Sequence, residues 1–199
     1  MAITNGYCTL SDVKAALRVS DTLDDSLLEM AIESASRLVD GYCGREFYSA
    51  GTVTRVYTPS DNFVTELDDF VSISQLKISS LADNNFDLTW EASDYQTEPL
   101  NGLIDGVRFP IDRVRAVGQY LFVLLNGHAT VQVTGVAGWS AVPIQVKQAT
   151  VIQAMRIFKR LDSPLGITFG ELGAMRVSMR LDPDVAQLVE ALRRIRNVG

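Results

Sequence analysis

The spacing of apolar residues changes twice along this chain, and the order of the changes limits how it can fold. A 3.6-residue spacing, typical of an amphipathic helix, relates Leu28, Ala31, Ile32, Ala35, Leu38, Val39 and Tyr42. From residue 51 to 138, short runs rich in Val, Thr, Ile, Tyr and Phe alternate with Asn, Asp, Gly and Pro, which indicates strands. Helical spacing returns after Pro143. We therefore predict an α+β protein: residues 1–45 and 143–199 form a small, discontinuous helical bundle, and residues 46–142 form a long inserted β domain.

Capping signals predict where the helices begin and end. Thr9 precedes Asp12 by three residues, and Thr22 precedes Asp25 by three, so we expect a capping box at the start of each of the first two helices. The other boundaries are set by glycines, prolines and one aspartate: Gly41 and Gly44 after the second helix, Pro143 before the third, and Asp182 with Pro183 before the last.

The clearest local β signal is a turn. Asn126 and Gly127 separate an apolar run at 121–125 from an alternating run at 128–134. Asn-Gly readily adopts the two positive φ angles of a type I′ turn, so we predict a β-hairpin here.

Charge and composition exclude several classes of protein. The 199 residues include 24 acidic and 18 basic side chains, a net charge of −6, which opposes binding to nucleic acid phosphates. No apolar run approaches the length of a membrane span, and residues 1–6 lack the basic and apolar regions of a secretory signal. We therefore expect that the protein does not associate with a membrane. We also expect that it is made in the cytoplasm. Cys8 and Cys43 are too few for a disulfide framework and are interpreted as buried free thiols.

The chain shows no convincing catalytic or cofactor-binding motif. The single histidine, His128, lies beside the predicted turn, and no nucleophile motif accompanies it. Residues 83–94 imitate the oxygen spacing of a calcium loop, but Leu88 stands where that loop requires glycine. We expect no catalytic residue, metal or cofactor. The alternative is a metal-dependent hydrolase or nuclease that uses Asp68, Asp69, Asp83 or Asp87.

Two segments are candidates for contacts with other proteins. The first is punctuated by glycines at 166, 170 and 173 and carries four apolar residues that we expect at an interface: Ile167, Phe169, Leu172 and Met175. The second is the final helix, with an apolar stripe of Val185, Leu188 and Leu192 and a basic end of Arg193, Arg194 and Arg196. This stripe either docks on a partner or completes the core of the chain itself.

The order of these elements resembles one family. A capped helix at 9–18, an acidic link at 21–25 and a helix at 27–44 are similar to the head-to-tail connector proteins of long-tailed double-stranded DNA phages, also called adaptors or head-completion proteins. Three later stretches look like the adaptors of actinobacterial phages and prophages: residues 138–149, 158–166 and 181–185. The β insert is much longer than in the smallest members of the family.

The resemblance implies a structural virion protein without enzymatic activity. Such a protein forms a ring, a dodecamer in this family, beneath the portal protein of the DNA-filled head. The ring offers a docking surface to the next neck or tail-completion protein, and DNA passes through its lumen without specific binding. On this basis we assign the segment at 167–175 to contacts between subunits or with the next neck protein, and the final helix to the portal. The alternative within the virion is a tail-completion or terminator protein.

Overall fold

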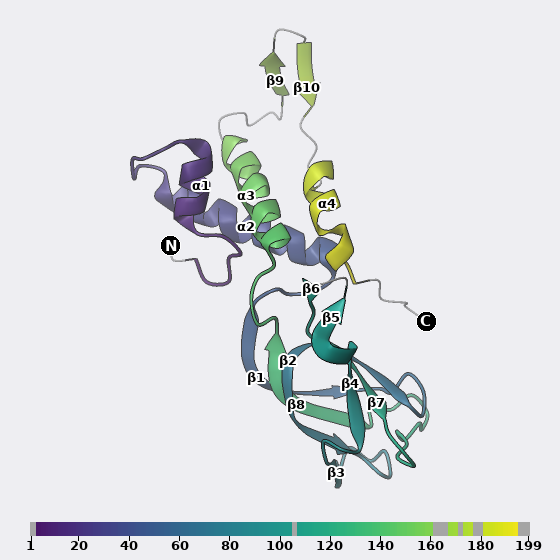
Figure 1. Cartoon of the computed structure of the whole chain (residues 1–199). Coiled ribbons are helices and arrows are strands. Elements are labelled where there is room, and N and C mark those ends of the chain that lie inside the picture. The colour runs from purple at the N-terminus through teal and green to yellow at the C-terminus, as the bar shows by residue number, and fades with distance from the viewer. Residues whose placement is uncertain (1–2, 105–106, 161–166, 171–172, 177–180, 195–199) are drawn as a thin grey trace. The chain divides into compact units, whose positions relative to one another are not determined.

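The chain folds into two compact units in a computed structural model that describes residues 3–104, 107–160, 167–170, 173–176 and 181–194. One unit comprises residues 1–47 and 142–199 and is mainly helical, and the other comprises residues 48–141 and is built from strands (Figure 1). The predicted α+β class is confirmed. No helix in the described residues is long and apolar enough to cross a membrane.

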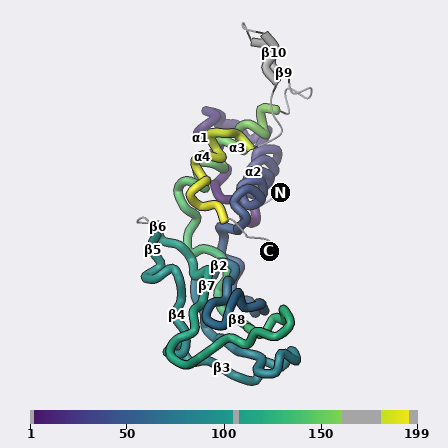
Figure 2. The backbone as a smooth tube through the Cα atoms, turned by 90° about the vertical axis from the view of Figure 1, so that its right-hand side faces the viewer, coloured from purple at the N-terminus to yellow at the C-terminus, as the bar shows by residue number. Residues whose placement is uncertain are grey.

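The helical unit contains four helices and a small hairpin. The helices are α1 (Leu10–Leu17), α2 (Asp25–Cys43), α3 (Ile144–Lys159) and α4 (Pro183–Val189), and a 3-10 turn at Glu190–Leu192 follows α4. The hairpin between α3 and α4 pairs β9 (Ile167–Gly170) with β10 (Gly173–Arg176). Figures 1 and 2 show α2 in one layer of this unit and α1, α3 and α4 in another.

One of the two predicted capping boxes forms. At α1, the Thr9 hydroxyl accepts the Asp12 amide, and the Asp12 carboxylate accepts the Thr9 amide at 2.9 Å. The box predicted at α2 is wrong, because the N-cap is Asp24 and its side chain accepts no capping hydrogen bond. The Asp25 carboxylate is instead held by Lys14 of α1 at 2.6 Å. At the other end of α2, Gly44 is the left-handed C-cap as predicted, whereas Gly41 lies inside the helix.

The helical core joins segments that are far apart in the sequence. Val13 of α1, Leu28 and Ile32 of α2 and Ala154 of α3 are buried together, and Met155 packs partly buried against them. The final helix α4 is fixed at its start by Asp182, whose side chain accepts the Asp184 amide at 2.8 Å and pairs with Arg156 of α3. Residues 1–47 therefore obtain their core only together with residues that lie after the β unit.

The β unit is an antiparallel sheet in the order β1-β8-β2-β7-β4, with β3 paired to β2. Its strands are β1 (Ser49–Tyr57), β2 (Val64–Ile78), β3 (Leu88–Trp90), β4 (Tyr95–Glu98), β7 (Ile111–Ala116) and β8 (Val131–Gly138). A 3-10 turn (Leu100–Gly102) and a short hairpin of β5 (Leu103–Ile104) and β6 (Val107–Arg108) lie between β4 and β7. Phe70, Leu76 and Val133 are among the buried residues of its core, and Trp90 stacks on Phe122 with centroids 4.9 Å apart.

The predicted turn at 126–127 forms, but the predicted hairpin ladder does not. Asn126 and Gly127 have φ angles of 50° and 72°, and the His128 amide donates to the Leu125 carbonyl at 2.9 Å. Residues 121–125 are nevertheless not a strand. Because β8 pairs with β1 along one edge and with β2 along the other, the segment before the turn has no free edge to join.

Gly135 allows two strands to approach closely in the centre of this sheet. A Cβ atom at Gly135 of β8 would lie 2.1 Å from the Ser72 carbonyl oxygen and 3.0 Å from the Ile73 Cα of β2. Strand β2 has an irregular register on both sides of this point. A side chain here would therefore push the two central strands apart.

Candidate interaction surfaces

The glycine-punctuated segment coincides with the β9–β10 hairpin. Ile167 and Phe169 lie in β9 and Met175 lies in β10, whereas Leu172 is outside the described residues. The structure describes the backbone of these strands and not their side chains. Their assignment to a contact between subunits or with a neck protein stays a prediction.

The apolar stripe of the final helix is largely occupied within the chain. Val185 and Leu192 are 0% and 3% exposed, so they belong to the core of the helical unit, which is the second of the two interpretations made from the sequence. Leu188 is half-buried. Docking on a portal through Val185 or Leu192 would require α4 to leave its place.

The basic end of this helix is partly engaged. Arg193 is exposed, lies over the Tyr42 ring at 5.3 Å and is 3.6 Å from Glu190. The Arg194 amide donates to the Cys43 carbonyl at 2.7 Å, and Arg196 lies outside the described residues. Of the two arginines that the structure describes, Arg193 is therefore the one whose charge is exposed at the surface.

An apolar stripe that the sequence analysis missed runs along the outer face of α2. Leu27, Met30 and Leu38 are 39%, 53% and 41% exposed, and the uncharged Ser34 and Gly41 continue the same face. Leu38 was expected on the buried face, which is wrong. We call this surface the α2 stripe. The sequence did indicate this stripe: a second apolar series lies beside the buried one, with Leu27 one residue before the buried Leu28 and Leu38 one residue before the buried Val39.

The opposite layer of the helical unit carries an apolar hollow of about 510 Å³. It is lined mainly by α3, with contributions from α1 and α4: Asp12, Ile144, Lys147, Gln148, Val151, Ile152 and Leu188. We call this surface the α3 hollow. Its most exposed apolar side chain is Ile144, at 61%. At its rim, Lys147 pairs with Asp12 at 2.9 Å, and the Thr9 hydrogen bonds together with Lys147 lower the pKa of Asp12 to about 2.

Charge is divided unevenly within the helical unit. Residues 1–47, which form α1 and α2, contain eight acidic and four basic side chains, whereas residues 142–199, which contain α3 and α4, have five acidic and nine basic ones. These segments thus carry −4 and +4. The remaining residues, 48–141, have eleven acidic and five basic side chains, so the net charge of the whole chain, −6, equals that of the β unit.

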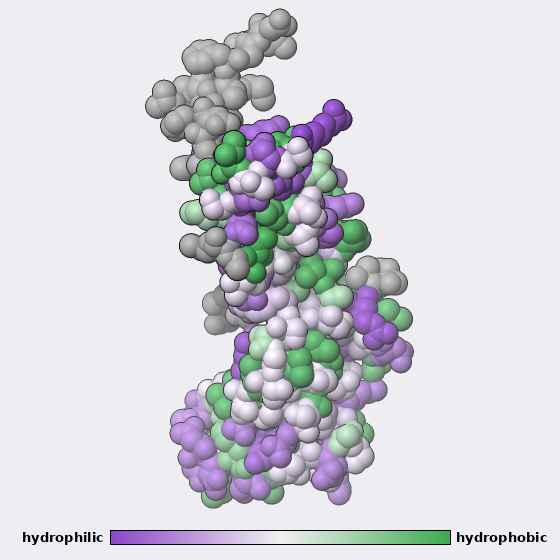
Figure 3. Space-filling view, turned by 90° about the vertical axis from the view of Figure 1, so that its left-hand side faces the viewer, coloured by the Kyte–Doolittle hydropathy of each residue, from purple (hydrophilic) through white to green (hydrophobic). Residues whose placement is uncertain are grey.

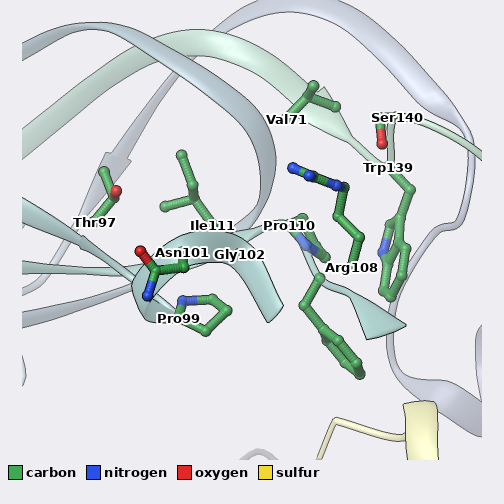
Figure 4. Close-up of a pocket in the computed structure, with 11 residues that line it drawn as sticks. Val71, Thr97, Pro99, Asn101, Gly102, Arg108, Pro110, Ile111, Trp139 and Ser140 are labelled. Carbon is green, nitrogen blue, oxygen red and sulfur yellow. The ribbon is translucent and has the colours of Figure 1, made fainter. Parts of the chain in front are cut away.

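The β unit has its own hollow of about 280 Å³ (Figure 4). Thr97, Pro99 and Asn101 lie on one side of the view, and Arg108 and Trp139 lie on the other. The indole of Trp139 is fixed from behind, since its Nε1 donates to the buried Asp69 at 2.8 Å. The hollow therefore has one exposed cation, Arg108, beside the aromatic ring of Trp139. Its lining residues include no pair of an acid and a base.

The aspartates considered for metal chemistry have structural partners. Asp68 accepts hydrogen bonds from Arg55 at 2.7 Å and from Tyr57 at 3.2 Å. Asp83 and Asp87 are bonded to serines in their own loop, and Asp69 holds Trp139. Across the part of the chain that the structure describes, no three His, Cys, Asp or Glu side chains are grouped so that they could hold a metal ion.

The two cysteines are buried and free, as interpreted from the sequence. Cys8 is 5% exposed and Cys43 is 0% exposed. Burial raises the pKa of each thiol to about 12.

Hydrophobic residues also reach the surface elsewhere. On the face shown in Figure 3, apolar and polar residues are interspersed over both units. In the β unit, the loop that precedes β8 exposes Tyr120, Leu121, Leu124 and Leu125 by 41% to 49%, while its Phe122 is anchored in the core.

Comparison with known proteins finds one matching family model and two structures of similar fold. Residues 7–98 match the family described as phage gp6-like head-tail connector protein. A chain in the neck of an empty GTA particle, computed with C6 symmetry, has the same fold: the match has a TM-score of 0.59 and 17% sequence identity and covers 100% of this chain and 95% of that one. A chain in the neck of a native GTA particle, computed with C12 symmetry, matches with a TM-score of 0.56, 17% identity and the same coverage. No curated protein matches the chain. The resemblance to the phage head-tail connector proteins that the sequence indicated is thereby confirmed, and the family match extends over residues 7–98.

Proposed function

We propose that this protein is a head-to-tail adaptor that forms a ring beneath the portal of a phage particle. The ring joins the DNA-filled head to the neck and tail and continues the DNA channel. The observation that carries the proposal is the connector family match at 7–98, on a chain whose whole length has a fold found in particle necks. The protein is made in the host cytoplasm and ends in the virion.

A ring agrees with the surfaces of the helical unit. Both neck structures have cyclic symmetry, and a cyclic assembly needs two different contact surfaces on each copy. The α2 stripe and the α3 hollow are two such surfaces. We propose a dodecamer, because twelve copies are what C12 symmetry gives with one chain in each repeat.

The charge of the β unit agrees with the passage of DNA without specific binding. Its eleven acidic and five basic side chains repel phosphates within roughly a Debye length, about 8 Å at physiological salt. DNA that moves through the ring during ejection would therefore meet no adhesive surface from this unit.

The portal and the next neck or tail-completion protein are the proposed partners. Because Val185 and Leu192 are buried, the portal contact at the final helix is narrowed to its basic end, where Arg193 offers a forked donor to carboxylates. The β9–β10 hairpin, with Ile167, Phe169 and Met175, is the candidate for the neighbouring subunit or the next neck protein.

Deletion of the gene for this protein, followed by imaging of the particles that still assemble, tests this function. Electron microscopy should show DNA-filled heads without tails, whereas normal tailed particles would refute the proposal. A binding assay separates the adaptor from a tail terminator: the adaptor binds purified portal rings, and a terminator binds the tail tube. Nuclease activity of the purified protein with magnesium or manganese, lost on mutation of Asp68, Asp69, Asp83 or Asp87, would indicate the metal-dependent alternative.

A further inference from the structure

We infer that neighbouring copies in the ring join head to tail through the helical unit, with the α2 stripe of one copy seated in the α3 hollow of the next. The inference rests on the proposed ring and names the two surfaces that build it. Of the residues that form these two surfaces, Leu188 alone was among the interface candidates that the sequence suggested.

The two surfaces lie on opposite sides of one compact unit. Helix α2 forms one layer, and α1, α3 and α4 form the other (Figures 1 and 2). The buried face of α3 includes Val146, Ala149 and Gln153, and the hollow is on the opposite face of the helix, with Ile144, Gln148 and Ile152. In a C12 ring, successive copies are related by about 30°, so the two contact faces of each copy must lie nearly back to back.

The shapes and polarity of the two surfaces are complementary. The α2 stripe is convex because it is one face of a single helix, and it presents Leu27, Met30 and Leu38 with no charged residue among them. The α3 hollow is concave and mainly apolar, with Ile144 exposed at 61%. Ridges of one helix packing into a groove between others is the usual geometry of helix association.

Charge favours this pairing over pairing of like surfaces. The segment that carries the α2 stripe has a net charge of −4, with Asp21 and Asp24 just before the stripe. Helix α3, which carries most of the hollow, has three basic side chains and no acidic one, and its Lys159 is exposed on the face of the hollow, seven residues after Ile152. Stripe against stripe would bring two acidic segments together, whereas stripe against hollow brings opposite charges together.

A cysteine trap tests the contact. The substitutions are Met30→Cys and Ile144→Cys, at the most exposed apolar side chain of each surface, and the buried native cysteines do not compete. On oxidation with copper phenanthroline, with and without portal rings, the double variant should give a ladder of cross-linked multimers. The two single variants mixed together should give dimers and nothing larger, and each alone should give monomers.

Two results would overturn the inference: no ladder from the double variant in either condition, or efficient dimerisation of the Met30→Cys variant alone, which would show stripe against stripe. Leu81→Cys combined with Ile144→Cys is the matched control, because Leu81 is 73% exposed in the β unit and should not be trapped.

Charged substitutions give a second readout. Met30→Glu and Ile144→Glu place a charge on an exposed position and should leave the melting temperature unchanged, yet weaken self-association about tenfold or more in sedimentation experiments. Leu81→Glu should leave association unchanged. If the double cysteine variant forms no ladder but the protein binds portal rings, this contact is refuted and the adaptor function stands. If the ladder forms but the protein does not bind portal rings, the adaptor function is refuted and the contact stands.

Discussion

Adding one methyl group to two different glycines should change stability in opposite directions. At Gly135, an alanine Cβ would lie 2.1 Å from the Ser72 carbonyl oxygen, whereas unstrained heavy-atom contacts need about 3.5 Å. The strands must separate by more than about 1 Å, and we expect a cost of about 3 kcal/mol from overpacking and weakened ladder bonds. At Gly41, inside α2, nothing lies within 4 Å of the added Cβ. Gly41→Ala should therefore stabilise the helical unit by about 0.8 kcal/mol.

Urea denaturation can follow the two units separately. Both tryptophans, Trp90 and Trp139, lie in residues 48–141, so their fluorescence reports on the β unit, while far-UV circular dichroism is dominated by the helices. With an m-value of about 1.5 kcal/mol/M, Gly135→Ala should lower the fluorescence midpoint by about 2 M and Gly41→Ala should raise the dichroism midpoint by about 0.5 M. An unchanged fluorescence midpoint for Gly135→Ala would refute the close approach of β8 and β2.

Three further predictions concern the helical unit. Met155→Asp should destabilise it by about 2–4 kcal/mol, because an unpaired charge would enter the core, and an unchanged melting temperature would show that Met155 is exposed. The depressed pKa of Asp12 means that its carboxylate stabilises the fold above the unfolded value of about 3.9, and this contribution is lost as the pH falls towards about 2; Asp12→Asn should flatten acid denaturation in that range. Cys8 and Cys43 should resist a thiol reagent at about pH 8 until the unit unfolds, and rapid labelling of the native protein would contradict their burial.

The fold class was predictable because the spacing of apolar residues is a local property. The capping box at Thr9 and the turn at Asn126-Gly127 were predicted for the same reason, since each involves a few consecutive residues. The hairpin ladder was not, because the edges of β8 are taken by strands at 49–57 and 64–78, far away in the sequence. Pairing of distant strands leaves no mark on the residues beside the turn.

The interaction surfaces were harder to predict than the fold. An amphipathic stripe shows that a helix has an apolar partner, but not whether the partner is the same chain, so Val185 and Leu192 suited a portal groove and the chain's own core equally well. For helix α2 the error was the opposite: an exposed apolar face was overlooked. Its buried series, with Leu28 and Ile32, masked the exposed series of Leu27 and Met30 beside it.

The two ends of the β unit lie side by side, because its first and last strands pair with each other. The chain enters it at Tyr48 and leaves it at Ala141, and Ser49 of β1 pairs with Gly138 of β8. Paired residues of antiparallel strands lie about 5 Å apart, a gap that a linker of two or three residues can close. A short linker at these two positions could therefore replace the β unit while α2 and α3 keep their packing, and the unit could be grafted elsewhere at the same two positions.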